Sequence, residues 1–152
     1  MTHRKLIWHL YPWFLTTMLA AIFVLTWYTS GILRSFSLEK IQADLRNQSL
    51  VLKPQMTRYL LTRQYETIDR LCKEFGLEAA TRITVVLPGG SVVGDSDKNP
   101  SAMDSHIDRP EILQAIHQGV GTSVRYSGTL DQNLMYQAVQ LNDPSGGVIG
   151  VL

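Results

Sequence analysis

An uninterrupted apolar segment dominates the first quarter of the chain. Residues 6–33 contain no Asp, Glu, Lys or Arg. At about 1.5 Å per helical residue, this segment is longer than the roughly 30 Å apolar core of a bilayer. Aromatic residues gather towards its two ends, as is typical of the two membrane–water interfaces: Trp8, Tyr11, Trp13, Trp27 and Tyr28. The pattern predicts a transmembrane helix over residues 6–33.

A cleaved signal peptide is the alternative interpretation of this segment. Its apolar region would span about 7–15 residues and precede a cleavage site of small residues. The run here is longer, and no Ala-x-Ala pattern follows it, so we expect an uncleaved anchor. His3, Arg4 and Lys5 precede the helix, and cationic residues beside a membrane segment are retained in the cytoplasm. We therefore expect a single span of the inner (cytoplasmic) membrane, with residues 1–5 cytoplasmic and residues 34–152 extracytoplasmic.

A helical pattern continues beyond the membrane segment, over residues 35–53. An apolar seam at three- and four-residue spacing comprises Leu38, Ile41, Leu45 and Leu52. Such a seam either pairs with a second copy, giving a homodimer, or packs on its own domain. Pro54 removes a helical hydrogen bond and clashes with the preceding turn, so we expect a kink or break near residues 51–53.

A second helical stretch is predicted over residues 55–75, with Gly76 as its C-terminal stop. Its apolar face comprises Tyr59, Leu60, Ile68, Leu71, Cys72 and Phe75. A short helix is predicted with Asp108 or Arg109 as its N-terminal cap residue, Pro110 at its start in the first turn, and Gly119 at its end.

Short β-branched runs before and after the short helix predict strands. Two flank a Pro-Gly-Gly turn and indicate a hairpin, and three follow the short helix; the five segments are 82–87, 91–94, 122–127, 134–141 and 148–152. The order predicts an α+β fold, in which one antiparallel sheet carries helices on one side. Because the last apolar run is cut by the end of the chain, we expect the final strands of the domain to be incomplete.

Charge and cysteine content narrow the class of protein. Lys plus Arg is 14 and Asp plus Glu is 13, whereas a nucleic-acid-binding protein usually carries a basic excess on one face. Cys72 is the single cysteine, which excludes an intrachain disulfide and favours a buried thiol over an intermolecular bridge. Gly-x-Ser-x-Gly and His-Glu-x-x-His motifs are absent from the sequence, so we expect no catalytic residues in this chain.

Part of the chain resembles the extracytoplasmic sensor region of phosphate-regulon-type (PhoR-like) sensor histidine kinases. The residues that carry the resemblance are 95–97, 103–106, 109–112, Gly121, Ser123, 125–127, Thr129, Leu130, Met135, Tyr136 and Ala138. The resemblance covers most of residues 1–152 and is most specific over residues 94–141. It implies a Cache-like sensor domain, related to PAS domains, in which a long helix leads into a curved antiparallel sheet. It also implies a second membrane helix, a HAMP linker and a kinase core downstream.

The resemblance implies a role in two-component signal transduction. The chain would detect an external cue and pass it across the membrane to a kinase core that this sequence does not contain. ATP and Mg would then be cofactors of that core alone, with none in this chain. The implied partners are the lipid bilayer, a second copy of the chain, a response regulator and, if sensing is direct, a small molecule. A diguanylate cyclase or chemoreceptor output, or a membrane-anchored interaction protein, are the alternatives.

If a ligand binds directly, polar residues between the hairpin and the third strand are expected to line the site. The candidates are His106, Arg109, Arg125 and Tyr126, because Arg binds carboxylate or phosphate groups and Tyr offers a flat wall with a polar tip. A structural role is the alternative, with Arg109 paired to Asp104 or Asp108. Arg125 and Tyr126 are consecutive on a predicted strand, so only one of them can face a given side of the sheet.

Four acidic residues lie in the same region: Asp95, Asp97, Asp104 and Asp108. Their spacing lacks the regular alternation and closing Glu of an EF-hand loop. We therefore expect a solvated acidic loop and no metal site.

Overall fold

The computed structural model describes residues 3–127 and 132–152, and within them the side chains of residues 11–29, 38–126 and 133–152. The chain divides into two compact units, Met1–Ile41 and Gln42–Leu152. Helix α1 (His3–Leu61) contains residues of both units. Residues 1–2 of the predicted cytoplasmic segment, and Thr129 and Leu130 of the resemblance, lie outside the described residues.

The first unit contains a segment that fits the predicted membrane helix. Tyr11–Thr29 is long and apolar enough to cross a bilayer by length and composition, and none of it is buried. Its threonine hydroxyls donate to backbone carbonyls three or four residues earlier in the helix, as Thr16 does to Trp13 and Thr26 to Ile22. These local hydrogen bonds satisfy hydroxyl groups that would otherwise be costly to place in an apolar environment.

The helix break predicted near residues 51–53 is wrong, because α1 continues through Pro54 and ends at Leu61; a kink there stays a prediction. Leu52, Met56 and Leu60 are all buried in one apolar core, and a break at Pro54 would separate Leu52 from the other two. The turn comes instead at Arg63, whose φ of 53° is left-handed. It is closed by hydrogen bonds from the Gln64 and Arg63 amides to the carbonyls of Tyr59 and Leu60, 3.0 Å each, the pattern of a Schellman motif.

Helix α2 (Tyr65–Ala79) also departs from the prediction, because it continues past Gly76. A Cβ atom at position 76 would lie 2.4 Å from the Cβ of Ser96. Gly76 is therefore a point of close approach to the loop after β2, and the left-handed residue that ends the helix is Ala80, with φ 48°. The apolar face predicted over residues 59–75 is confirmed as part of the core, although two helices share it.

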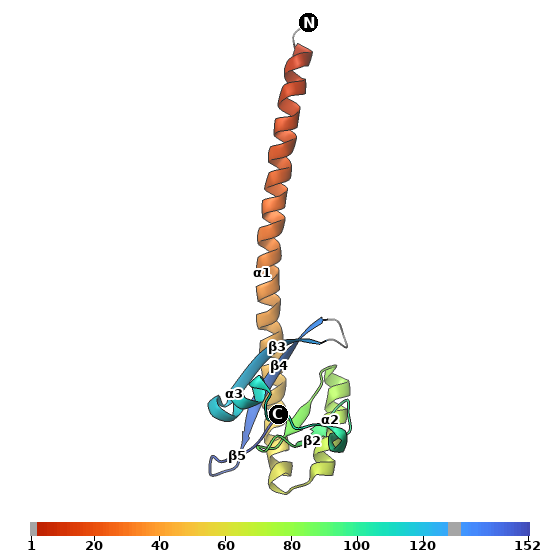
Figure 1. The fold of residues 1–152 in the computed structure, drawn as a ribbon, viewed down its shortest axis with the longest axis vertical. Coiled ribbons are helices and arrows are strands. Elements are labelled where there is room, and N and C mark those ends of the chain that lie inside the picture. The colour runs from red at the N-terminus through yellow and green to blue at the C-terminus, as the bar shows by residue number, and fades with distance from the viewer. Residues whose placement is uncertain (1–2, 128–131) are drawn as a thin grey trace. The chain divides into compact units, whose positions relative to one another are not determined.

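A five-stranded antiparallel sheet forms the centre of the second unit (Figure 1). Its strands are β1 (Thr84–Val86), β2 (Val92–Asp95), β3 (Val120–Ser127), β4 (Gln132–Asn142) and β5 (Val148–Val151), in the order β2-β1-β5-β4-β3. A 3-10 turn, η1 (Pro100–Ala102), and helix α3 (Pro110–Gln118) lie between β2 and β3. The predicted start of α3 at Pro110 and its end at Gly119, with φ 86°, are confirmed.

Helices cover both faces of this sheet, so the expectation that helices lie on one side only is wrong. The consecutive residues Val85 and Val86 are both buried, and consecutive strand residues point to opposite faces. Val85 belongs to the core formed with α1 and α2, whereas Val86 belongs to a second core with Ile112 and Ala115 of α3. The loop and helix between β2 and β3 therefore form a separate layer.

Candidate functional site

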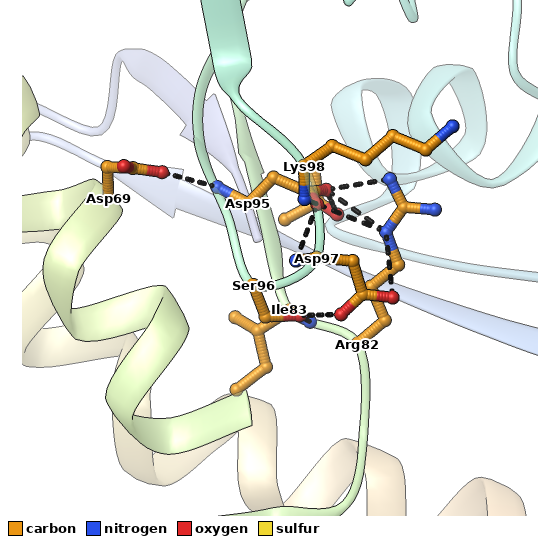
Figure 2. A network of polar contacts seen from close by, with 8 residues as sticks. Asp69, Arg82, Ile83, Asp95, Ser96, Asp97 and Lys98 are labelled. Carbon is orange, nitrogen blue, oxygen red and sulfur yellow. Dashed lines mark hydrogen bonds and ion pairs between the residues drawn. The ribbon is translucent and has the colours of Figure 1, made fainter. Parts of the chain in front are cut away.

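The first polar cluster of the second unit surrounds the carboxylate of Asp95, at the end of β2 (Figure 2). Asp95 is 0% exposed. It accepts hydrogen bonds from the Arg82 guanidinium (3.0 Å), the Thr84 hydroxyl (2.7 Å) and the amides of Asp97 (3.0 Å) and Lys98 (2.8 Å). Burial alone would raise the pKa of Asp95, but the hydrogen bonds from Thr84, Arg82 and the two amides hold its pKa below the ordinary value.

The expected solvated acidic loop is therefore wrong for Asp95 and correct for the other three aspartates. Asp97, Asp104 and Asp108 are exposed. Both oxygens of Asp95 are occupied by donors of the protein itself, so its carboxylate acts as a structural acceptor that ties β1 to the loop after β2. Within residues 3–127 and 132–152, no group of three or more His, Cys, Asp or Glu could hold a metal ion.

A second polar cluster lies where α3 packs against β3 and β4. Glu111 of α3 is 4% exposed, and its Oε1 lies 2.5 Å from Nη2 of Arg125 on β3. The Arg125 guanidinium also lies 4.1 Å from the centre of the Tyr136 ring on β4, a cation–π distance. A Cβ atom at Gly121 would lie 2.0 Å from the Glu111 carbonyl oxygen, so this glycine allows α3 to approach the strand.

Arg109 lies immediately before α3 and is half-buried. The predicted alternative of an ion pair with Asp104 or Asp108 is absent: across the described residues, no hydrogen bond or salt bridge engages the Arg109 side chain. Burial lowers the pKa of its guanidinium, the nearby charge of Arg125 lowers it further, and Glu111 raises it. Arg109 is thus a cation whose charge interacts with those of Arg125 and Glu111. Among the described residues, no protein group accepts a hydrogen bond from its guanidinium.

His106 belongs to the loop that precedes α3 and is 7% exposed. Its backbone amide donates to the carbonyl of Gly90, 2.9 Å away. Gly90 has a φ of +88°, and a Cβ atom there would lie 2.3 Å from the Ser105 hydroxyl, so glycine is required beneath this loop. Burial lowers the pKa of His106, and the positive charge of Arg109 lowers it further. The imidazole is therefore mainly neutral at pH 7.

Three buried polar atoms of this cluster have no hydrogen-bond partner: Nδ1 of His106, Oε2 of Glu111 and Nε of Arg125. Buried polar groups are normally paired, and each exception calls for an explanation such as a ligand or a bound water. Arg109, Arg125, Glu111 and the neutral His106 together carry a net charge of +1. The residues of this α3-face cluster are His106, Arg109, Glu111, Arg125 and Tyr136.

The structure brings together three of the four candidate residues. His106, Arg109 and Arg125 belong to the α3-face cluster, whereas Tyr126 is 63% exposed and lies on the opposite side of β3. Ligand binding by any of the four stays a prediction.

Sequence reasoning missed Glu111 and Tyr136. In the sequence, Glu111 stands out only as a member of the segment 109–112 that carries the resemblance. Tyr136 pairs with Ser123, which shares a face with Arg125 through the two-residue strand period. That period was the available signal for Tyr136, but using it required the register of β3 against β4.

Comparison with known proteins adds no relative. No family model matches the chain, and no curated protein matches it.

Proposed function

We propose that the chain is the N-terminal sensor portion of a membrane-bound two-component sensor histidine kinase. The observation that carries the proposal is helix α1, which contains the apolar segment Tyr11–Thr29 and, further along, residues of the sheet domain core such as Met56. One membrane-length helix that leads into a folded α+β domain is the covalent layout of a single-pass receptor. The sheet domain is then extracytoplasmic, with residues 1–5 in the cytoplasm.

A Cache/PAS-like identity of the domain is part of this proposal. A long helix leads into one antiparallel sheet, and the first and last strands, β1 and β5, pair with each other at its centre. α3 and the preceding loop cover the face opposite to α1 and α2. This arrangement supports a sensor domain in which the loop-and-helix layer closes over the sheet.

The α3-face cluster supports a sensory role for that layer. It combines an Arg109 side chain without a protein partner and three buried polar atoms without hydrogen bonds. Burying a polar atom unpaired costs about 1–3 kcal/mol, and a bound ligand or water would offset this cost. Ligand occupancy would then change the domain only if the ligand binds two conformations with different affinity.

Cysteine accessibility in intact cells tests the orientation. The natural thiol, Cys72, is buried and should not react with a membrane-impermeant maleimide. Ser101 is exposed, so Ser101→Cys should be labelled in intact cells if the sheet domain is extracytoplasmic. Thr2→Cys is the matched control, and it should be labelled only after permeabilisation. Labelling of Ser101→Cys only after permeabilisation would refute the receptor topology.

The coding sequence beyond Leu152 tests the output. A second apolar span followed by a His-containing dimerisation helix and ATP-binding motifs would support the kinase. A diguanylate cyclase or chemoreceptor module in that place would reject the kinase and retain the sensor. A stop codon soon after residue 152, without a second span, would instead favour a membrane-anchored interaction protein.

A further inference from the structure

The part of α1 that belongs to the second unit carries an apolar stripe on its exposed side. Its members are Leu50, Val51, Pro54 and Leu61, all of them exposed. Positions 50, 54 and 61 are spaced by four and seven residues, so they share one side of the helix. Leu52, Met56 and Leu60 lie on the opposite side, in the core of the domain. The predicted seam thus packs on its own domain through Leu52, and a different face of the helix is open.

Cations flank this stripe without acidic partners. Residues 42–61 contain Arg46, Lys53 and Arg58 against the single acid Asp44. Among the described residues, no carboxylate forms a salt bridge with any of the three cations. At 3.6 residues per turn, Arg46 and Lys53 lie on one flank of the stripe and Arg58 on the other. A partner that covers the stripe favourably therefore carries acidic residues along its edges.

A second copy of the chain fits this face poorly. Under the proposed membrane anchoring, two copies leave the bilayer on the same side, so their α1 helices run parallel. In a parallel helix pair, Lys53 of one copy and Arg58 of the other take the flanking g and e positions that face each other, and like charges repel. An antiparallel pair centred on Val51 would bring Asp44 to Arg58, but two chains anchored in one membrane cannot adopt it.

From the stripe and its charges we infer that residues 42–61 of α1 form a docking surface for an acidic amphipathic helix of a second protein. The stripe packs against the apolar side of that helix. Arg46, Lys53 and Arg58 pair with carboxylates on its flanks. This inference adds a protein partner to the proposed sensor, and its preference for a foreign helix over a second copy rests on the proposed membrane anchoring.

Binding is measured on the full chain, residues 1–152, in phosphatidylcholine nanodiscs, with empty nanodiscs as the background. The probe is a fluorescein-labelled peptide of about three heptads, with Leu at positions a and d and Glu at e and g. A matched basic peptide carries Lys in place of Glu. Fluorescence anisotropy at pH 7 should show saturable binding of the acidic peptide, about tenfold tighter than that of the basic peptide. The difference should shrink at high salt, because exposed ion pairs are screened.

Two double variants separate the charges from the apolar contact. Lys53→Gln with Arg58→Gln should weaken binding of the acidic peptide about fivefold, without weakening that of the basic peptide. Leu50→Gln with Val51→Gln should weaken binding of both peptides about tenfold or more, because the burial of two apolar side chains is lost.

The matched control for charge is Arg70→Gln with Lys98→Gln, which removes two exposed cations outside α1. It should leave both affinities unchanged. Because Cys72 is buried in the core that α1 helps to form, its protection from maleimide verifies that each variant is folded.

The inference is overturned by the absence of saturable binding of the acidic peptide, by equal affinity for the two peptides, or by unchanged affinity of the Lys53→Gln, Arg58→Gln variant. Phosphatidylglycerol vesicles test a lipid surface as the occupant. Vesicle binding that this variant abolishes, without binding of the acidic peptide, would assign the face to anionic lipid instead.

Cross-linking tests a second copy as the occupant. Asn47 is exposed and lies on the same face, three residues before Leu50. Under mild oxidation, Asn47→Cys should form disulfide-linked dimers no faster than Ser101→Cys, and faster dimer formation would overturn the inference. The peptide measurements do not depend on which side of the membrane the domain lies. Their failure therefore leaves the receptor topology intact, whereas failed labelling of Ser101→Cys in intact cells leaves the peptide binding intact.

Discussion

At the scale of single residues, Cys72 shows how completely the α1–α2 core excludes solvent. The thiol is fully buried, and burial, with smaller contributions from Asp69 and Asp95, raises its pKa to about 12. At pH 8 about one thiol in ten thousand is then ionised, and only the thiolate reacts with alkylating reagents. We expect native protein to react with a maleimide at least ~100-fold more slowly than protein unfolded in urea, measured by mass spectrometry.

The exposed thiol of Ser101→Cys provides the internal standard for that measurement, since it should react at the same rate in both conditions. Comparable rates for Cys72 in native and unfolded protein would show that the core opens readily.

Like the Cys72 thiol, the Asp95 carboxylate is fully buried. Asp95→Asn removes the ion pair with Arg82 and replaces one acceptor by a donor. Because Arg82 is partly exposed and can be rehydrated, we expect a loss of about 2–3 kcal/mol in the free energy of unfolding, below the usual cost of an orphaned buried charge. Urea unfolding at pH 7, followed by near-UV circular dichroism of tyrosine, measures this loss.

The pH dependence of the same variant has a definite sign. The pKa of Asp95 is lowered in the folded state from its ordinary value of 3.8, so the carboxylate stabilises the protein above that pH and loses its contribution as pH falls through the folded pKa. The stability difference between wild type and Asp95→Asn should therefore shrink below about pH 3.8. Asp97→Asn is the control, because its carboxylate is 58% exposed and 3.9 Å from Arg82, and it should cost less than about 1 kcal/mol.

At the scale of elements, local sequence signals predicted where structure occurs better than where it ends. Pro110 and Gly119 bound α3 as predicted, since both residues act through their own backbone conformation. The helix ends predicted from Pro54 and Gly76 are wrong, because tertiary contacts at both positions override the local backbone preference of the residue. Continuous burial of Leu52, Met56 and Leu60 keeps α1 helical through Pro54, and the contact with Ser96 explains Gly76.

Gly76→Ala tests whether Gly76 is a point of close approach to Ser96 or an ordinary glycine in a helix interior. In an exposed helix interior, Gly to Ala stabilises by about 1 kcal/mol. Here the new Cβ atom would lie 2.4 Å from the Cβ of Ser96, so we expect a loss of about 1–3 kcal/mol from overpacking, measured by urea unfolding. The matched control is Gly89→Ala, whose added Cβ meets nothing within 4 Å; its effect should stay within about 0.5 kcal/mol. A stabilised Gly76→Ala would mean that α2 does not pack closely on the loop after β2.

At the scale of the whole sheet domain, the strands were predictable but their burial on both faces was not. The apolar run of β1 fits a strand buried on one face or on two, because period-two alternation is lost when both faces are apolar. The candidate site has the same dependence on tertiary structure. Residue types alone selected His106, Arg109 and Arg125, but the partnership of Arg125 with Glu111 requires α3 to lie against β3, which Gly121 permits.

The contribution of α1 to this domain leads to a prediction about fragments. Leu52, Met56 and Leu60 are buried against the sheet, and burying each such side chain contributes about 1.5–3 kcal/mol. Their sum approaches the total stability of a typical domain, about 5–15 kcal/mol. A fragment of residues 42–152 should therefore fold, with Cys72 protected from maleimide, whereas a fragment of residues 62–152 should leave Cys72 reactive.

Two substitutions in the longer fragment separate core packing from chain length. Met56→Ala should cost about 2–5 kcal/mol, because Met56 is fully buried. Val51→Ala, at a position 78% exposed on the same helix, should change stability by less than about 0.5 kcal/mol. Equal protection of Cys72 in both fragments, or equal costs for the two substitutions, would show that α1 only tethers the domain. The expected difference would instead make residues 52–60 part of the domain itself, so that the helix containing the apolar segment also supplies its core.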